Sequence, residues 1–178
     1  MAEKFIVLRR VLSGWIRDNA SVTQLNTALL ATIYAFLSKH NVLNLAYADG
    51  QSMGACALWF AADEACTCYF LSSLTTHHGA ALAGGGEVAF TVQKDEQDWR
   101  MIQGVQAKGR CSLVEDATRT QAWAIYTKRF PFVTQQFPDL ATALAKTRLW
   151  QIQPTWLRLI DNTQGFGHKD ELAITNNQ

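Results

Sequence analysis

Residues 68–78 read Cys68-Tyr-Phe-Leu-Ser-Ser-Leu-Thr-Thr-His-His78. The first half is apolar and aromatic, as in a buried strand, and the second half is rich in hydroxyls and imidazoles. The next residues, Gly79-Ala-Ala-Leu-Ala83, predict a short helix. The first N–H groups of a helix have no internal partner and carry the positive end of its dipole, so a strand that ends here favours an anion. An ordinary turn with a Ser or Thr cap is the competing interpretation.

The polar half of this stretch offers six side chains that can donate hydrogen bonds to a phosphate. They are Ser72, Ser73, Thr75, Thr76, His77 and His78.

Composition restricts the class of protein. The chain has 178 residues, 48% of them hydrophobic and 17% charged, which predicts one globular domain with its own core. The net charge of +1, without a basic block, argues against a nucleic-acid-binding protein. We find neither a signal peptide nor a membrane-spanning run, so we expect a cytoplasmic protein. Its four cysteines then act as reduced, buried side chains, and their spacing predicts no metal site.

The hydrophobic pattern changes from helical to strand-like along the chain. Helical spacing at residues 5–15 predicts an amphipathic extension over about residues 1–21, and a second helix follows at 21–36. Alternation and turn signals then predict strands at 42–48, 53–62, 66–72, 88–94, 100–114 and 149–161. Two further helices are expected at 117–129 and 140–146. Five or six mostly antiparallel strands with peripheral helices indicate a small β-barrel of the α+β kind.

Two details of the strands are also expected. Asp49-Gly50 is a hairpin signal between the first two strands. Gly104 or Gly109 should bend the long fifth strand, and Pro154 should mark an edge or a bulge in the last one.

Gly50-Gln-Ser-Met-Gly54 matches the nucleophile elbow of serine hydrolases, with Asp161 and His168 later in the chain. That elbow needs a strand, a sharp turn and a helix, whereas residues 55–60 predict another strand. The interpretation as a hydrolase is therefore disfavoured.

Several motifs, taken together, resemble the FMN-binding split-barrel superfamily of pyridoxamine 5′-phosphate oxidase. They are Ala57-Leu-Trp-Phe60, Tyr69-Phe-Leu-Ser72, Thr76-His-His78 and Val105-Gln-Ala-Lys-Gly109. Gly104–Gly109, Tyr126-Thr-Lys-Arg-Phe-Pro131 and Asp161-Asn-Thr-Gln-Gly-Phe-Gly167 resemble an uncharacterised bacterial branch of it. The likeness runs from about Leu25 to Lys169, and the Asp-Asn-Thr-x-Gly-Phe-Gly motif is its most specific part.

The resemblance implies a six-stranded antiparallel split β-barrel that holds FMN at a homodimer interface. Ser72 then stands at the threonine position and Thr76 at the Ser/Thr position of the motif that reaches the FMN phosphate, and we expect Ser73 to bind the cofactor as well. His77 takes the place of a basic residue, and His78 takes the place of a lysine. Because an imidazole has an ordinary pKa of about 6.5, this departure implies a weaker, pH-dependent grip on the phosphate.

The resemblance also implies which residues meet the flavin ring. The backbone of Ala57, Leu58 and Trp59 should lie along the ring edge, and Gln106 should add an amide contact. Lys108 and Arg110 share the strand face of Gln106, but a solvated outer face explains them better.

Three functions remain open. The first is an FMN-dependent oxidoreductase acting on a small molecule, in which the cofactor carries the chemistry and no side chain is assigned as catalytic. The second is a non-catalytic flavin- or haem-binding sensor or carrier, with His77 and His78 as candidate haem ligands. The third is a structural dimer whose anion site is vestigial.

Overall fold

The computed structural model describes residues 19–135, 142 and 144–174. Its strands are β1 (Val42–Asp49), β2 (Ser52–Ala62), β3 (Cys68–Ser72), β4 (Gly86–Gln93), β5 (Gln103–Leu113), β6 (Arg148–Asp161) and β7 (Lys169–Ala173). Its α-helices are α1 (Asn19–Leu37), α2 (His77–Ala81) and α3 (Asp116–Arg129). Short 3-10 helices are η1 (Trp99–Met101), η2 (Pro131–Thr134) and η3 (Asn162–Gln164).

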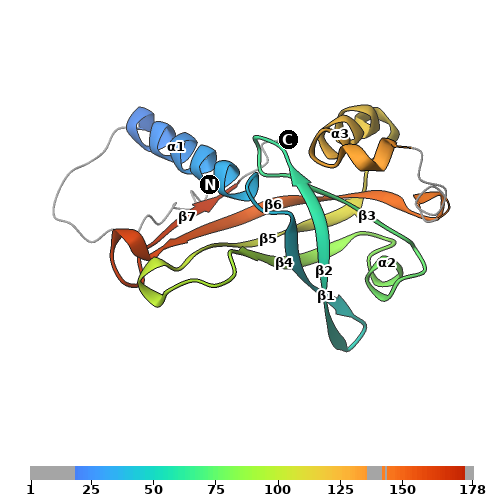
Figure 1. The fold of residues 1–178 in the computed structure, drawn as a ribbon, viewed down its shortest axis with the longest axis horizontal. Helices are drawn as coiled ribbons and strands as arrows, with labels where there is room; N and C mark the ends of the chain where they lie inside the picture. Colours follow the sequence, from blue (N-terminus) through green and yellow to red (C-terminus); the bar gives the residue numbers. More distant parts are fainter. Residues whose placement is uncertain (1–18, 136–141, 143, 175–178) are drawn as a thin grey trace, which may run out of the picture.

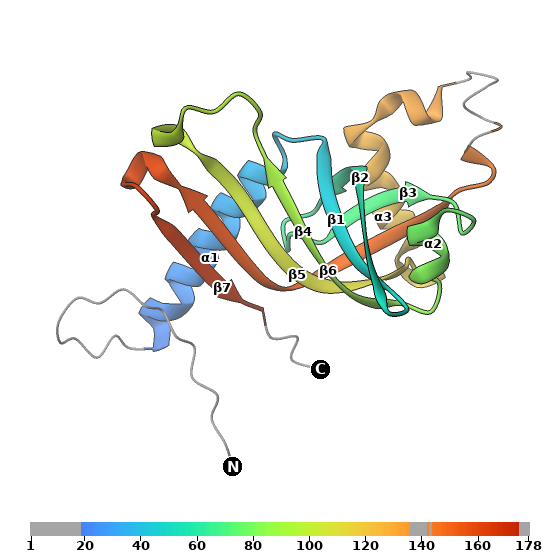
Figure 2. The ribbon, with the colours of Figure 1, turned by 90° about the horizontal axis from the view of Figure 1, so that it is seen from below.

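The strands form one antiparallel sheet in the order β3-β2-β1-β4-β5-β6-β7, and β3 also pairs with β6. This second pairing joins the ends of the six-strand series, while β7 extends the sheet beyond β6 (Figures 1 and 2). The fold is therefore the split barrel that the sequence predicts. Strand β7 is an addition that the hydrophobic pattern does not predict.

Strand β6 belongs to two parts of the sheet. On one side it pairs throughout with β5, and on the other its first part, residues 148–152, pairs with β3 and its last part, residues 156–160, pairs with β7. Pro154 lies between these parts and opposite Gly109, where the β5–β6 register shifts. A proline has no N–H to donate to a ladder, so the change of partner at this point leaves no bond unmade. The predicted strand irregularity at Gly109 is therefore present as a register shift.

Two apolar clusters stabilise the barrel. The larger fills its interior and includes the fully buried Phe60, Phe70 and Trp150. The smaller lies between β3 and α3, where Tyr69 packs with Ala122 and neighbouring side chains.

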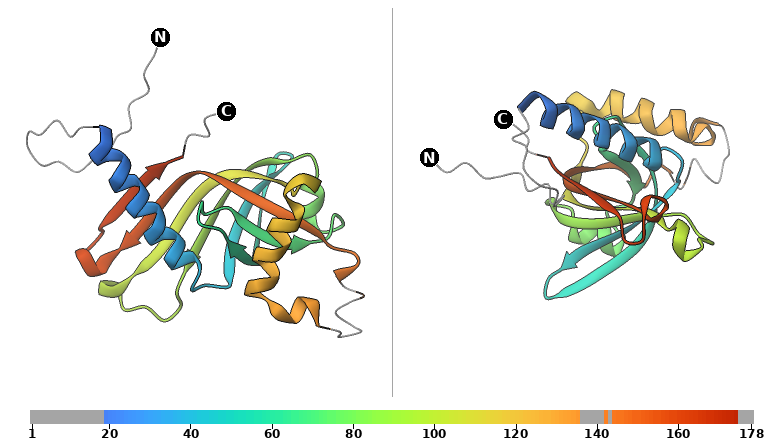
Figure 3. Two further views of the ribbon diagram at one scale, coloured as in Figure 1. Left: turned by 90° about the horizontal axis from the view of Figure 1, so that it is seen from above. Right: turned by 90° about the vertical axis from the view of Figure 1, so that its left-hand side faces the viewer.

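Helices α1 and α3 lie on the same side of the barrel (Figures 1 and 3). Ile33 and Leu37 of α1 are fully buried in the interior cluster, so this helix covers an open part of the barrel. None of the described helices has the length and apolar run that crossing a membrane requires.

Three of the element boundaries that differ from the predicted ones have a local cause. β3 starts at Cys68 instead of residue 66, because Cys66 has φ 62° and belongs to the preceding turn. α2 starts at His77, before the predicted Gly79, because Thr76 caps it. β5 starts at Gln103, since residues 99–101 form η1. The predicted helix at 5–15 lies outside the described residues, as do residues 140, 141 and 143 of the one at 140–146.

Candidate functional site

The turn between β3 and α2 brings three of the predicted phosphate ligands together. Ser72 Oγ lies 2.6 Å from His78 Nε2 and 3.2 Å from Thr76 Oγ1, and Thr76 Oγ1 lies 3.2 Å from His78 Nε2. We call Ser72, Thr76 and His78 the hydroxyl–imidazole cluster. Its side chains are half-buried or buried, and its polar atoms converge on one point. A phosphate could accept hydrogen bonds there from the Ser72 hydroxyl and a ring N–H of His78, and from the Thr76 hydroxyl once its proton turns away from the Ser73 carbonyl.

Local backbone geometry explains the shape of this turn. Thr76 has extended φ and ψ of −75° and 157°, and its hydroxyl oxygen accepts a hydrogen bond from the Gly79 N–H at 3.1 Å. The same hydroxyl donates to the Ser73 carbonyl at 2.9 Å. A Cβ at Gly79 would collide with the Ser73 carbonyl, so the tight turn requires glycine at this position. The structure thus contains both the capped turn and the polar cluster that the sequence leaves as alternatives.

His78 is held against the hairpin of β1 and β2. Its ring meets Tyr47 edge-on, with centroids 6.2 Å apart, and Tyr47 in turn occupies the space that a side chain at Gly54 would need. Burial, together with the neighbouring His77, lowers the pKa of His78 below its ordinary value. Tyr47 and Gly54 are not among the predicted site residues, although their cross-strand pairing around the Asp49-Gly50 turn could have identified them.

The other predicted donors at this turn are more exposed. His77 lies on the surface, and its imidazole makes no hydrogen bond or ion pair among the described residues. Ser73 Oγ and Thr75 Oγ1 bond to each other at 2.9 Å on the outer side of the turn. The indole of Trp150 donates to the Ser72 carbonyl at 3.1 Å and so fixes the end of β3 to β6.

Strand β2 has a free edge beside this cluster. Its pairing with β3 covers only Phe60–Ala62, so residues 52–59 pair with β1 alone among the described strands. The Phe60 N–H donates to Asn41 on the β1 side. In an antiparallel ladder alternate residues point to opposite sides, so the N–H and C=O groups of Ala57 and Trp59 point to the free edge.

The side chains of the residues predicted to meet the flavin ring alternate between the core and the outer face of the sheet. Leu58 is buried in the core, whereas Ala57 and Trp59 lie on the outer face. Trp59 packs on Phe130 and Phe132, with ring centroids 5.0 and 5.6 Å away. This aromatic packing holds Trp59 in place at the end of the free edge that adjoins β3.

Gln106 lies on a strand well separated from β2. It is on β5, three strands from β2 in the sheet order, which corresponds to about 14 Å from Ala57 at a strand spacing of ~4.8 Å. Its Oε1 accepts a hydrogen bond from Arg158 at 3.0 Å, and Arg158 also pairs with Glu171 at 2.8 Å. Within one copy of the chain, Gln106 and Ala57 therefore do not contact each other directly.

Lys108 and Arg110 are exposed on the same face as Gln106, as the sequence indicates. The Lys108 ammonium lies 5.6 Å from the Trp156 ring centroid, and Arg110 is 3.8 Å from Glu87. Neither cation reaches toward the cluster in these contacts.

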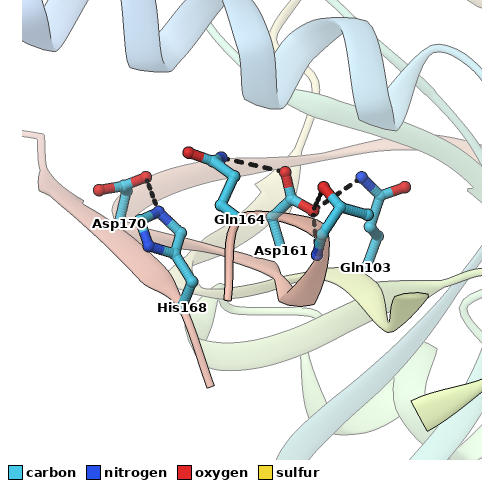
Figure 4. A network of polar contacts seen from close by, with 6 residues as sticks. Gln103, Asp161, Gln164, His168 and Asp170 are labelled. Atoms are coloured by element: carbon cyan, nitrogen blue, oxygen red, sulfur yellow. Dashed lines mark hydrogen bonds and ion pairs between the residues drawn. The ribbon is translucent and has the colours of Figure 1, made fainter. Parts of the chain in front are cut away.

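Asp161 anchors the most specific motif of the sequence. Its carboxylate accepts hydrogen bonds from Thr163, Gln164 and Gln103 (Figure 4). Partial burial alone would raise the pKa of Asp161, but these hydrogen bonds outweigh it and hold the pKa below its ordinary value. His168 contacts Asp170 at 3.0 Å instead (Figure 4).

The elements of the rejected hydrolase triad are thus separate. Ser52 donates to the Asp49 carbonyl in the β1–β2 turn, which lies well apart from the β6–β7 turn with Asp161 and His168 (Figures 1 and 2). The Gly50–Gly54 motif forms a hairpin instead of an elbow.

Comparisons with known proteins agree on the fold. The family model described as pyridoxamine 5′-phosphate oxidase matches residues 29–161. A UPF0306 protein from Photorhabdus laumondii is 31% identical over 139 residues, which is 77% of this chain and 90% of that protein. The structure of a heme binding protein from Mycobacterium smegmatis has a TM-score of 0.63 at 16% identity, over 83% of this chain and 57% of that one. An FAD binding protein from the same organism has a TM-score of 0.54 at 15% identity, over 80% of this chain and 94% of that one.

Proposed function

Because this chain belongs to the pyridoxamine 5′-phosphate oxidase family, we propose that it is an FMN-binding flavoprotein. The FMN phosphate binds at the hydroxyl–imidazole cluster, and the edge of the flavin ring lies along the free edge of β2. When bound, FMN supplies hydride or electron transfer to or from a small molecule. The chain's own part is to bind the phosphate, orient the ring and limit access of water. We assign no side chain as catalytic, and we place the protein in the cytoplasm.

One observation carries the proposal: the cluster and the free edge of β2 adjoin. His78 contacts Tyr47, which packs over Gly54 on β2, and Ala57 lies about 10 Å further along the same strand at ~3.3 Å per residue. The phosphate end and the ring end of one ligand could therefore lie on one continuous surface. Unpaired backbone N–H and C=O groups suit a ring whose edge alternates acceptors and donors.

We further propose that FMN lies at a homodimer interface. The outer face of the sheet carries small side chains in register across β2, β1 and β4, namely Ala55, Ala46 and Ala89. A flat face of this kind lets a second copy approach closely. Because Gln106 lies three strands from Ala57 within one chain, we expect its contact with flavin to come from the partner copy.

Visible absorption tests the cofactor. Purified protein is mixed with FMN, desalted and scanned, and its molar mass is measured by light scattering. We expect a retained flavin spectrum at close to one FMN per chain and the mass of a dimer. A colourless protein after desalting would contradict FMN binding and favour a vestigial anion site. A monomeric flavoprotein would contradict the interface alone.

Haem binding is the second candidate, because the exposed imidazole of His77 makes no hydrogen bond or ion pair among the described residues. An imidazole in this state is free to bind iron. Titration with haemin should then give a Soret band that His77→Ala shifts or removes. A band that is identical in the variant would exclude His77 as the ligand.

A further inference from the structure

The proposed phosphate site lacks a permanent positive charge from its own segment. Residues 40–93, which form β1 to β4 and α2, contain neither lysine nor arginine. Of the two histidines at the turn, His78 has a lowered pKa and is mainly neutral at pH 7. A phosphate monoester carries between one and two negative charges at that pH, since its second pKa is about 6. A cation from another part of the chain would therefore strengthen binding.

Strand pairing brings one arginine to the cluster. In the β3–β6 ladder, Ser72 stands directly opposite Arg148. Directly paired residues of an antiparallel ladder share a face, with Cβ atoms ~5 Å apart. The next pair on that face, Phe70 and Trp150, stacks with centroids 6.0 Å apart. The Arg148 side chain therefore leaves β6 on the same face as the Ser72 hydroxyl.

Arg148 is also available for a ligand. Its side chain is exposed, and its one recorded bond among the described residues runs from Nη1 to the carbonyl of the adjacent Thr147, at 3.3 Å. Other arginines of the barrel are engaged with side chains. Arg110 faces Glu87 at 3.8 Å, and Arg158 faces Glu171 at 2.8 Å.

We propose that Arg148 binds the phosphate of the ligand at the hydroxyl–imidazole cluster and supplies the permanent charge that the turn lacks. This assignment rests on the proposed FMN function for the identity of the ligand. A guanidinium can donate two parallel hydrogen bonds to phosphate oxygens, and it remains charged at every physiological pH. Ser72 and Thr76 then orient the phosphate, and Arg148 neutralises it.

Paired ligands with and without the phosphate test this role. The dissociation constants of FMN and riboflavin are measured by flavin fluorescence for the wild type, Arg148→Gln and Arg100→Gln. Arg100 is a matched control, because it is exposed and lies in η1. This helix precedes Gln103, the end of β5 that is far from Ser72 and Arg148. We expect Arg148→Gln to weaken FMN binding about tenfold to a hundredfold and to leave riboflavin unchanged. Arg100→Gln should change neither affinity.

Inorganic phosphate separates this proposal from the identity of the cofactor. The His78 ring is titrated by NMR in the wild type and in Arg148→Gln, with and without phosphate. We expect phosphate to raise the pKa of His78 in the wild type and to have a smaller effect in the variant. This result, without FMN binding, would retain Arg148 as an anion ligand and reject the FMN function. Equal FMN affinity and equal phosphate response in the variant would reject Arg148 and leave the FMN function intact.

Discussion

Replacing His78 with glutamine should weaken FMN binding and remove most of its pH dependence between pH 6 and 8. The imidazole Nε2 lies 2.6 Å from Ser72 and 3.2 Å from Thr76, so it is close enough to share a phosphate with both hydroxyls. Glutamine keeps a hydrogen-bond donor at this position but cannot become charged. The comparison therefore isolates the charge of the imidazolium from its hydrogen bond.

The sign of the pH effect follows from the pKa of His78. Burial first, and His77 second, lower that pKa in the free protein, so the ring is mainly neutral at pH 7. An anionic phosphate raises the pKa of an adjacent imidazole, so FMN binding takes up a proton. FMN affinity should then rise as the pH falls from 8. The rise should level off near pH 6, where the phosphate itself begins to gain a proton.

The size of the effect follows from the strength of one hydrogen bond. A hydrogen bond to a charged group contributes about 1.5–3 kcal/mol, and a neutral one contributes about 0.5–1.5 kcal/mol. The difference of about 1–1.5 kcal/mol corresponds to roughly fivefold to tenfold in the dissociation constant. We expect this loss in His78→Gln at pH 6 and a smaller one at pH 8.

Fluorescence titrations at pH 6, 7 and 8 measure these constants, with His40→Gln as the control. His40 bonds to the Phe36 carbonyl at the end of α1. A wild-type affinity that is flat from pH 6 to 8, or equal in His78→Gln, would refute the contact between His78 and the phosphate.

Other predictions concern stability. Gly54→Ala should lower the free energy of unfolding by about 1–3 kcal/mol in urea titrations, because the new methyl group overlaps the Tyr47 ring; an unchanged midpoint would mean that the ring is free to move. Asn162→Ala should lower the free energy of unfolding by about 1–3 kcal/mol, because its buried amide donates to the Trp99 carbonyl at 2.7 Å. A decrease below about 0.5 kcal/mol, the lower limit for one hydrogen bond, would contradict this role. The lowered pKa of His78 means that the unfolded chain binds more protons below about pH 6.5. Stability should therefore fall faster on acidification in the wild type than in His78→Gln, and equal slopes in thermal unfolding would contradict the buried neutral ring.

Most strands of the barrel can be predicted from the sequence, because the alternation of apolar and polar residues indicates which face of each strand is buried. In β4, for example, Val88, Phe90 and Val92 point inward while the residues between them are exposed. The β1–β2 hairpin follows from Asp49-Gly50, since Gly50 has φ 62°. Strand β7 could not be predicted in this way, because Lys169-Asp-Glu-Leu-Ala173 has only one buried residue and its pairing depends on β6.

The site can be predicted only in part from the sequence, because it depends on contacts between segments that are far apart in the chain. The turn from Ser72 to His78 is local, and its convergence could be predicted from one motif. The pairing of Ser72 with Arg148 joins residues far apart in the chain and appears only once the β3–β6 register is known. The strand order likewise places Gln106 three strands from Ala57, a separation that the motifs alone do not indicate.

A crystal structure of the protein grown with FMN tests the central claim most directly. We predict that the phosphate will lie within hydrogen-bond distance of Ser72, Thr76 and His78, with the edge of the flavin ring against the backbone of Ala57 and Trp59. Bound FMN whose phosphate lies elsewhere, or crystals that take up no FMN at saturating concentration, would contradict it.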